Sequence, residues 1–203
     1  MLSLIRPALV LLLFFTALTG IAYPFFVTGV TQVALTANAN GSLIRHNGTV
    51  VGSALIGQAF KSDRYFRGRP SATTAPDPKD DTKTIDVPYN AASSAGSNLG
   101  PLSKKLLERD SADVENLKTA AALVIAADAV TTSASGLDPH ISPAFASLQV
   151  ERVARVRGIP QDRVQVVLDR LIERPFLGLI GEPRVNVLLL NLALDTAFAG
   201  ASG

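Results

Sequence analysis

A long uncharged segment opens the chain. No charged residue occurs from Pro7 to Ile44, and Leu, Val, Phe, Ala and Ile dominate the part from Ala8 to Val33. Because an α-helix rises about 1.5 Å per residue, about 20 apolar residues are enough to cross the hydrocarbon core of a bilayer. Pro24 would bend such a helix without excluding it. We therefore predict one transmembrane helix within residues 1–34.

A cleaved signal peptide is the alternative interpretation of this segment. Arg6 would then be its basic region, and residues 20–22 (Gly-Ile-Ala) would be its small-residue cleavage site. However, the apolar residues continue past that site, through Phe25, Phe26 and Val30. This continuation favours an anchor that is not cleaved.

The charges on either side of the segment predict its orientation. Arg6 and the α-amino group precede it, whereas no Lys or Arg follows it before Arg45. The positive-inside rule therefore places the N-terminus in the cytoplasm and the rest of the chain outside. We expect a single-pass protein in which residues 35–203 form one extracytoplasmic domain.

The composition excludes several classes of protein. A chain of 203 residues has room for one domain with a substantial core. The net charge is only +2, and Lys and Arg form no block with interleaved aromatic residues, so we expect no nucleic acid partner. The chain has no cysteine, which excludes disulfides and thiol catalysis. With two histidines and no carboxylate cluster, we predict no metal site and no firmly bound cofactor.

Turn signals and short β-prone pieces follow the apolar segment. Asn-Gly dipeptides at residues 40–41 and 47–48 adjoin the pieces 42–45 and 49–51, which predicts a hairpin close to the membrane. Residues 70–90 are rich in Pro, Thr, Asp and Lys, and we predict a surface loop there.

Helical signals dominate the chain after residue 100. Pro101 suits a first helical position after Asn98, and a stripe of leucines follows it. We expect this helix to continue through Leu117 and residues 123–125, with Asp110 and its neighbour Ser111 as candidates for a break.

Two further helices have clear start and stop signals. Ser142 suits an N-cap with Pro143 at the next position, and Gly158 ends that helix. Its predicted inward-facing residues are Phe145, Leu148, Val153 and Val156. Pro160 opens the next helix, which stops before Pro175.

The last segment predicts a strand over Val185–Leu188 and then a helix that reaches Phe198. Few strands and about four helices define the α+β class. The predicted fold is therefore one N-terminal transmembrane helix followed by a single extracytoplasmic α+β domain, with several helices and a small sheet.

The stretch TTSASGLDPHISP, residues 131–143, contains residue types that hydrolases use. Ser133, Asp138 and His140 lie within it, so a membrane-anchored periplasmic hydrolase is one interpretation. The stretch lacks a nucleophile elbow such as G-x-S-x-G. We favour the other interpretation, in which its prolines form a turn and a helix start and the loop docks on a partner.

Two short motifs resemble phosphate sites in composition. DDTKT, residues 80–84, lacks the Lys next to the Asp and the Gly of the P-type phosphorylation motif DKTGT. The chain also has no room for the catalytic domains of a pump. GSNLGPLSKK, residues 96–105, fails the P-loop pattern G-x-x-x-x-G-K-[ST]. A structural helix start is the favoured interpretation of this second motif, and an anion site is the alternative.

Arginines lie next to aromatic residues in YFRGRPSA, residues 65–72. Arg67 and Arg69 suit anchors of a protein interface. They suit ion pairs with Asp or Glu inside the domain equally well, and the sequence does not decide between the two.

Five motifs occur in order after the apolar segment: GSALIGQAF, YFRGRPSA, YNAASSAGSNLGP, VTTSASGLDPHISPAFASLQVERVARVRG and GEPRVNVLLLNLALD. Together they resemble the C subunit of the Kdp potassium-transporting P-type ATPase of bacteria and archaea, over nearly the whole chain. Ala95 stands where the family usually has a second glycine, and Ala127 where a proline is common. These departures affect local turns only.

The resemblance implies a non-catalytic subunit of a four-subunit complex in the bacterial inner membrane. Its partners would be a potassium-translocating A subunit, an ATP-hydrolysing B subunit, a single-span F subunit and membrane lipid. The family is held to be needed for assembly, and it is described as a catalytic chaperone that raises the ATP affinity of the B subunit, with which ATP would be shared. We expect YFRGRPSA and TTSASGLDPHISP to lie near each other or near the outer face of the A subunit.

The resemblance also implies one residue role. The position that matches the family's proposed nucleotide-contacting glutamine is Gln149. An extracytoplasmic Gln149 cannot reach cytoplasmic ATP, so this role conflicts with the predicted topology, and a polar residue on a packed helix is the alternative. We predict no catalytic and no metal-binding residue. The interface candidates are Arg67, Arg69, Asn98, Asp138 and His140.

Overall fold

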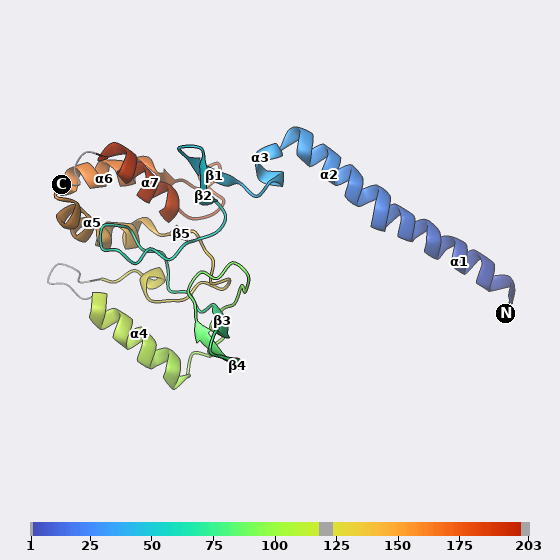
Figure 1. Cartoon of the computed structure of the whole chain (residues 1–203), viewed down its shortest axis with the longest axis horizontal. Coiled ribbons are helices and arrows are strands. Elements are labelled where there is room, and N and C mark those ends of the chain that lie inside the picture. The colour runs from blue at the N-terminus through green and yellow to red at the C-terminus, as the bar shows by residue number, and fades with distance from the viewer. Residues whose placement is uncertain (1, 118–123, 200–203) are drawn as a thin grey trace. The chain divides into compact units, whose positions relative to one another are not determined.

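The structure is a computed structural model that describes residues 2–117 and 124–199. The chain divides into two compact units, Met1–Ser53 and Ala54–Gly203. The first unit holds a long helix and a hairpin, and the second holds helices and two small antiparallel sheets (Figure 1). The predicted α+β class is confirmed.

The first unit begins with one long apolar helix. α1 (Leu2–Ala17) continues through a π-helical turn, η1 (Leu18–Ala22), into α2 (Tyr23–Ala34). The apolar stretch Ser3–Ala34 spans 32 residues, and none of them is buried. Its length of roughly 48 Å exceeds the roughly 30 Å of a hydrocarbon core. The predicted apolar helix is confirmed, and it is long enough to cross a membrane.

A short hairpin follows in the same unit. After one helical turn, α3 (Thr36–Ala39), strands β1 (Leu43–His46) and β2 (Thr49–Ser53) pair antiparallel. Asn47 and Gly48 connect them, both with positive φ, as a type I′ turn requires. The hairpin predicted at this Asn-Gly dipeptide is confirmed.

Three helices carry the core of the second unit. α5 (Pro143–Arg157) packs on α6 (Gln161–Arg170), and α6 packs on α7 (Val187–Ala197), as Figure 1 shows. Burial of apolar side chains between these elements is the main driving force for folding. The members of this cluster larger than alanine are Phe66, Ile141, Phe145, Val150, Val153, Val164, Leu168, Val185, Val187, Leu190 and Leu194.

Both ends of α5 agree with the sequence signals. The Ser142 hydroxyl accepts a hydrogen bond from the Phe145 N–H, and Pro143 occupies the first helical position. Gly158 ends the helix with a φ of 66°. One inward-facing residue was predicted wrongly, because Val156 lies at the edge of the buried face and is 49% exposed.

A three-stranded antiparallel sheet joins the segments around these helices. β7 (Arg184–Asn186) lies between β5 (His140–Ile141) and β6 (Ile172–Glu173). The helix expected from Pro160 to the residue before Pro175 therefore ends earlier than predicted, because residues 172–173 pair with β7.

The boundary between the last strand and the last helix also differs from the prediction. The strand was expected to include Val187 and Leu188, but both belong to α7. Asn186 ends the strand because its side-chain oxygen accepts the Leu189 N–H at 3.1 Å and so caps the helix.

The segment expected to be a surface loop contains a second hairpin. β3 (Thr74–Asp77) and β4 (Asp80–Asp86) pair antiparallel. The Asp77 carboxylate accepts the Lys79 N–H at 2.8 Å and stabilises the turn between them. The threonines and the isoleucine of β4 favour a strand, a signal that the Pro- and Asp-rich composition obscured.

The helix after this hairpin begins later than predicted. α4 (Lys104–Leu117) starts after Pro101, which lies in a turn where the Ser103 N–H donates to the Gly100 carbonyl. It runs through Asp110 and Ser111 without a break. Part of its expected continuation over residues 123–125 lies outside the described residues, and residues 124–125 are not helical.

Candidate functional site

An irregular segment, residues 63–69 (DRYFRGR), links the core helices to the loops, and we call it the arginine segment. Side chains from other parts of the domain hydrogen-bond its backbone. From α5, Arg152 donates to the Tyr65 carbonyl at 3.1 Å. Arg157 donates to the Arg64 carbonyl at 2.8 Å. Because buried carbonyl groups require partners, these arginines hold the segment in its path.

Two side-chain amides hold the middle of the arginine segment. Asn191 of α7 accepts the Phe66 N–H at 2.8 Å and donates to the Phe66 carbonyl at 2.9 Å. Gln149 of α5 makes the same two bonds with Arg67, at 2.8 and 3.0 Å. Asn191 is 1% exposed and Gln149 is 5% exposed. Each side-chain amide therefore pairs with both the N–H and the carbonyl of one residue, as a neighbouring strand does in a sheet.

An ion pair between a buried arginine and a partly exposed aspartate lies beside the arginine segment. The Arg157 guanidinium is 2.9 Å from the Asp195 carboxylate, and the Arg157 side chain is 4% exposed. Tyr65 donates to the other carboxylate oxygen at 3.1 Å, and the Arg157 guanidinium lies 5.3 Å from the centre of its ring. Burial, together with the hydrogen bond to Asp195, raises the pKa of Tyr65. This group connects α5 and α7 to the segment between them.

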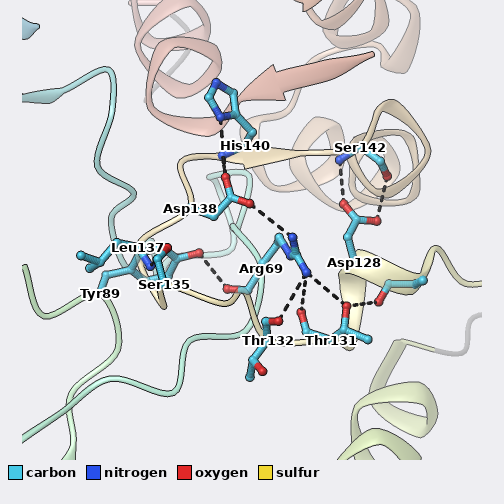
Figure 2. Close-up of polar contacts among 11 residues, drawn as sticks. Arg69, Tyr89, Asp128, Thr131, Thr132, Ser135, Leu137, Asp138, His140 and Ser142 are labelled. Carbon is cyan, nitrogen blue, oxygen red and sulfur yellow. Dashed lines mark hydrogen bonds and ion pairs between the residues drawn. The ribbon is translucent and has the colours of Figure 1, made fainter. Parts of the chain in front are cut away.

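Arg69, Asp138 and His140 form a second group, which we call the Arg69 cluster (Figure 2). Arg69 Nη1 lies 3.3 Å from the Asp138 carboxylate. Its Nη2 donates to the Thr131 and Thr132 carbonyl oxygens at 3.5 and 3.4 Å. Asp138 accepts the His140 N–H at 2.9 Å, and the His140 ring lies 3.6 Å from the same oxygen. The stretches YFRGRPSA and TTSASGLDPHISP therefore lie next to each other, which is one of the two arrangements expected from the sequence.

The charges of this cluster are set by its surroundings. Burial alone would raise the pKa of Asp138, but hydrogen bonds from His140 and the charge of Arg69 outweigh it, so this pKa lies below its usual value. Because the folded-state pKa of Asp138 is depressed, its ionised carboxylate stabilises the domain at pH values above the ordinary Asp pKa of about 3.9. This contribution is lost as the pH falls through the folded-state pKa. Beneath the cluster, burial raises the pKa of Tyr89 to about 12, so its hydroxyl remains the donor to the Arg69 carbonyl at 2.7 Å.

Two glycines let the loops approach each other this closely. A Cβ atom at Gly68 would lie 2.2 Å from the Tyr89 hydroxyl oxygen. One at Gly136, where φ is 67°, would lie 2.5 Å from the Thr73 methyl group. Both distances are far below van der Waals contact, so the packing of these loops requires glycine at each position.

The Arg69 cluster opens into a surface cavity of about 620 Å³. The other wall of the cavity comes largely from residues 173–184. Lining residues outside the cluster include Asp128, Ser142, Glu173, Arg174, Phe176, Ile180, Glu182 and Arg184. The lining combines charges of both signs with apolar side chains, a mixture that suits the region where the apolar core of a protein interface meets its polar rim. Within residues 2–117 and 124–199, no three His, Cys, Asp or Glu residues are grouped to hold a metal ion.

The similarity of the chain to known proteins identifies its family. Residues 5–196 match the family model described as KdpC, the c chain of the K⁺-transporting ATPase. The chain belongs to the KdpC family. The potassium-transporting ATPase KdpC subunit of Bradyrhizobium diazoefficiens is 58% identical over 200 residues, which cover 98% of this chain and 100% of that protein. The KdpC subunits of Rhodopseudomonas palustris and Methylobacterium nodulans are 57% and 54% identical, over 97% and 96% of this chain and 98% of each relative.

A KdpC chain is a non-catalytic accessory subunit of the Kdp potassium-uptake ATPase, so the membership and role implied by the five motifs are confirmed. The geometry gives no support to the alternative of an anchored hydrolase. Ser133 is 3% exposed. Among the residues that the structure describes, no hydrogen bond joins its hydroxyl to the His140 ring.

Two interface candidates of this KdpC chain lie outside the Arg69 cluster. The Arg67 guanidinium forms an ion pair with Asp63, four residues earlier, and remains about half exposed. Asn98 is exposed and has a φ of 50° in the loop before α4. The structure therefore brings together Arg69, Asp138 and His140, but neither Arg67 nor Asn98.

Sequence reasoning missed four residues that hold the arginine segment: Arg152, Arg157, Asn191 and Asp195. Asn191 and Asp195 carried a signal, because they interrupt an apolar helix at a spacing of four, which places them on one face. A polar residue on an apolar face is tolerated when it has a buried partner. Arg157 carried no such signal, because a basic residue in the last turn of a helix is common.

Proposed function

We propose that this KdpC chain is an assembly subunit whose extracytoplasmic domain docks on the A subunit of the Kdp complex, with the B and F subunits as further partners. The observation that supports this most is the Arg69 cluster at the cavity, where loops distant in sequence present charges of both signs around apolar side chains. Such a surface gives orientation and selectivity to a docking contact.

We also propose that residues 1–34 are a single transmembrane anchor of the bacterial inner membrane and that residues 35–203 lie outside it. The uncharged helix Ser3–Ala34 and the position of Arg6 before it support this division. The hairpin of β1 and β2 belongs to the first compact unit. Its Arg45 and polar turn nevertheless suit the water side of the anchor.

The proposed topology predicts the behaviour of fusion proteins. Alkaline phosphatase fused after residue 203 is expected to be active, because it folds in the periplasm. Green fluorescent protein fused there and exported through the general secretory route is expected to be dark. The opposite pair of results would place the domain in the cytoplasm and contradict the topology.

The mass of the mature chain is the control for the fusion experiment. A retained anchor leaves residues 1–22 in the purified protein. Loss of these residues would show that the segment is a cleaved signal peptide, in which case an active fusion would report export without anchoring.

We propose that Gln149 has a structural role and that ATP is held by the B subunit alone. Its side-chain oxygen accepts both the Arg67 N–H and, at 2.7 Å, the Arg152 guanidinium, while its side-chain nitrogen donates to the Arg67 carbonyl. The amide thus has partners on both ends and is buried. An influence of this chain on ATP affinity would then act through the assembled complex.

The docking role predicts that Asp138→Asn lowers the yield of complex. The substitution keeps the shape of the side chain but removes the charge that orients Arg69 and His140, and we expect about tenfold less A, B and F subunit to co-purify with the tagged chain. The amount of folded chain, from its urea unfolding curve in detergent, normalises each yield.

Asp80→Asn is the matched control for this experiment. Asp80 is also an ion-paired carboxylate, 2.8 Å from Lys83, but it lies in β4 and does not line the cavity. Its substitution is expected to leave co-purification unchanged. Equal yields for the two variants would show that the Arg69 cluster serves the domain alone.

A further inference from the structure

The cavity wall ends in an exposed apolar loop tip, Pro175–Gly181 (PFLGLIG). No charged or polar side chain occurs in it. Its four large apolar side chains, Phe176, Leu177, Leu179 and Ile180, are 68, 78, 87 and 67% exposed. Single exposed apolar residues are common on soluble domains, but four at one turn form a continuous patch that requires an explanation.

The backbone of this loop tip is hydrogen-bonded to itself. Phe176 and Ile180 exchange both of their N–H···O=C bonds, at 2.9 and 3.0 Å. Gly178 donates to the Pro175 carbonyl at 3.0 Å, and Leu179 donates to the Phe176 carbonyl at 3.1 Å. Pro175 has no N–H that needs a partner. Peptide groups that enter hydrocarbon must be satisfied internally, whereas those that face water or a protein can bond outward.

The turn at the loop tip holds a leucine in an unfavourable conformation. Leu177 has a φ of 53° and Gly178 a φ of 74°, the pattern of a type I′ turn. Asparagine is preferred at the first of these positions because a bulky L-residue is strained there. Leucine instead adds an apolar side chain to the tip in spite of the strain, which is typical of a functional position.

The charges at the base of the loop match the layers of a bilayer surface. Glu173 and Arg174 precede the apolar tip, and Glu182 and Arg184 follow it. Arg184 pairs with Glu173 at 2.9 Å, so the base is polar without a strong net charge. Such a base suits the headgroup layer while the tip enters the acyl boundary.

The chain also keeps this domain close to a membrane. Residues 35–53 join the long apolar helix to the domain. Even fully extended they reach at most roughly 65 Å. The local concentration of lipid around the domain is therefore high, so a small apolar contact is enough to be occupied.

We propose that the loop tip, Phe176–Ile180, inserts into the interfacial layer of the lipid bilayer as a second, shallow membrane contact of this chain. The four backbone hydrogen bonds within the tip and the absence of polar side chains from it favour lipid over a protein partner. The contact would orient the adjoining cavity at the membrane surface. It rests on the proposed membrane anchor and not on the docking role of the Arg69 cluster, although Phe176 and Ile180 also line the cavity.

A lipid-quenching experiment tests this contact. The chain has no cysteine, so Leu179→Cys provides one site for an environment-sensitive nitrobenzoxadiazole label. The full chain is reconstituted in phosphatidylcholine vesicles with or without lipid that carries a nitroxide at the headgroup. Leu102→Cys is the matched control, because Leu102 is 92% exposed but lies before α4. We expect about tenfold stronger nitroxide quenching at residue 179 than at residue 102, and weaker quenching by aqueous iodide.

Two further variants make the outcome specific. Phe176→Ser with Ile180→Ser, in the Leu179→Cys chain, should abolish the nitroxide quenching without unfolding the domain, because both side chains are exposed. Asp138→Asn should leave the quenching unchanged, which separates this contact from the docking role. Equal iodide access at residues 179 and 102 would overturn the proposal. Shielding of residue 179 that requires the A, B and F subunits, without nitroxide quenching, would also overturn it and assign the loop tip to a protein contact.

Discussion

Replacing Asp195 with alanine is expected to lower the free energy of unfolding by about 3 kcal/mol. The Arg157 side chain is only 4% exposed, so without Asp195 its charge stays buried with no counter-charge 2.9 Å away. Tyr65 loses the acceptor of its hydroxyl in the same step. This expected loss of stability is at the low end of the range for breaking a buried ion pair, because the Asp195 side chain is one-third exposed. Urea unfolding of the full chain in detergent, followed by circular dichroism, measures the change.

Lys83→Ala is the control for the ion pair. Lys83 lies 2.8 Å from Asp80, but its side chain is 72% exposed, so water and salt screen the attraction and stability is expected to change little. The double variant Arg157→Met with Asp195→Leu should regain part of the lost stability, because it buries no charge. If Asp195→Ala unfolds at the same urea concentration as Lys83→Ala, the pair does not hold α5 and α7 together.

Replacing Gln149 with alanine is expected to lower the free energy of unfolding by a similar amount, about 3 kcal/mol. The substitution leaves the N–H and the carbonyl of Arg67 without their partners at 2.8 and 3.0 Å, and it removes the acceptor of the Arg152 guanidinium at 2.7 Å. Gln149 itself is only 5% exposed. Each buried polar group without a partner is destabilising by about 1–3 kcal/mol. Gln149→Glu should be intermediate, because it keeps the acceptor for the Arg67 N–H and loses the donor to the carbonyl.

Gln165→Ala, on the neighbouring helix α6, is the matched control for Gln149. Its side chain bonds the exposed Asp169 at 2.8 Å, so its loss should hardly affect stability. A nucleotide contact by Gln149 predicts a different result: the Gln149→Ala domain would unfold like the Gln165→Ala control, while the assembled complex would need more ATP for half-maximal hydrolysis. The two measurements together therefore distinguish the structural role from the nucleotide role.

Local signals were sufficient for the elements that depend on short-range physics. The long helix follows from an uncharged apolar run, the turn at Asn47-Gly48 from the ease with which these residues adopt positive φ, and the start of α5 from the hydroxyl of Ser142. In each case the stabilising contact joins residues within one turn or one helix. Sequence reasoning is reliable there because the partners are neighbours in the chain.

The wrongly predicted boundaries depend on partners elsewhere in the chain. Residues 172–173 continue a helical pattern, yet they leave α6 because β7 offers them strand partners. Residues 74–86 looked like a loop because proline and aspartate are rare in strands, but pairing within the hairpin overrides that preference. Propensity is a weak signal wherever tertiary contacts compete with it.

The sequence by itself determined the family, the accessory role and the spanning length of the N-terminal helix, because the order of five motifs and one apolar run are visible without coordinates. Only the tertiary structure decided what the polar residues contact. Arg69 reaches Asp138, 69 positions away, whereas Arg67 pairs locally with Asp63. Gln149 holds a peptide 82 positions away. A guanidinium or an amide suits a protein interface and a partner inside the domain equally well. Which of the two it contacts depends on which distant backbone N–H and carbonyl groups the fold leaves without a backbone hydrogen-bond partner.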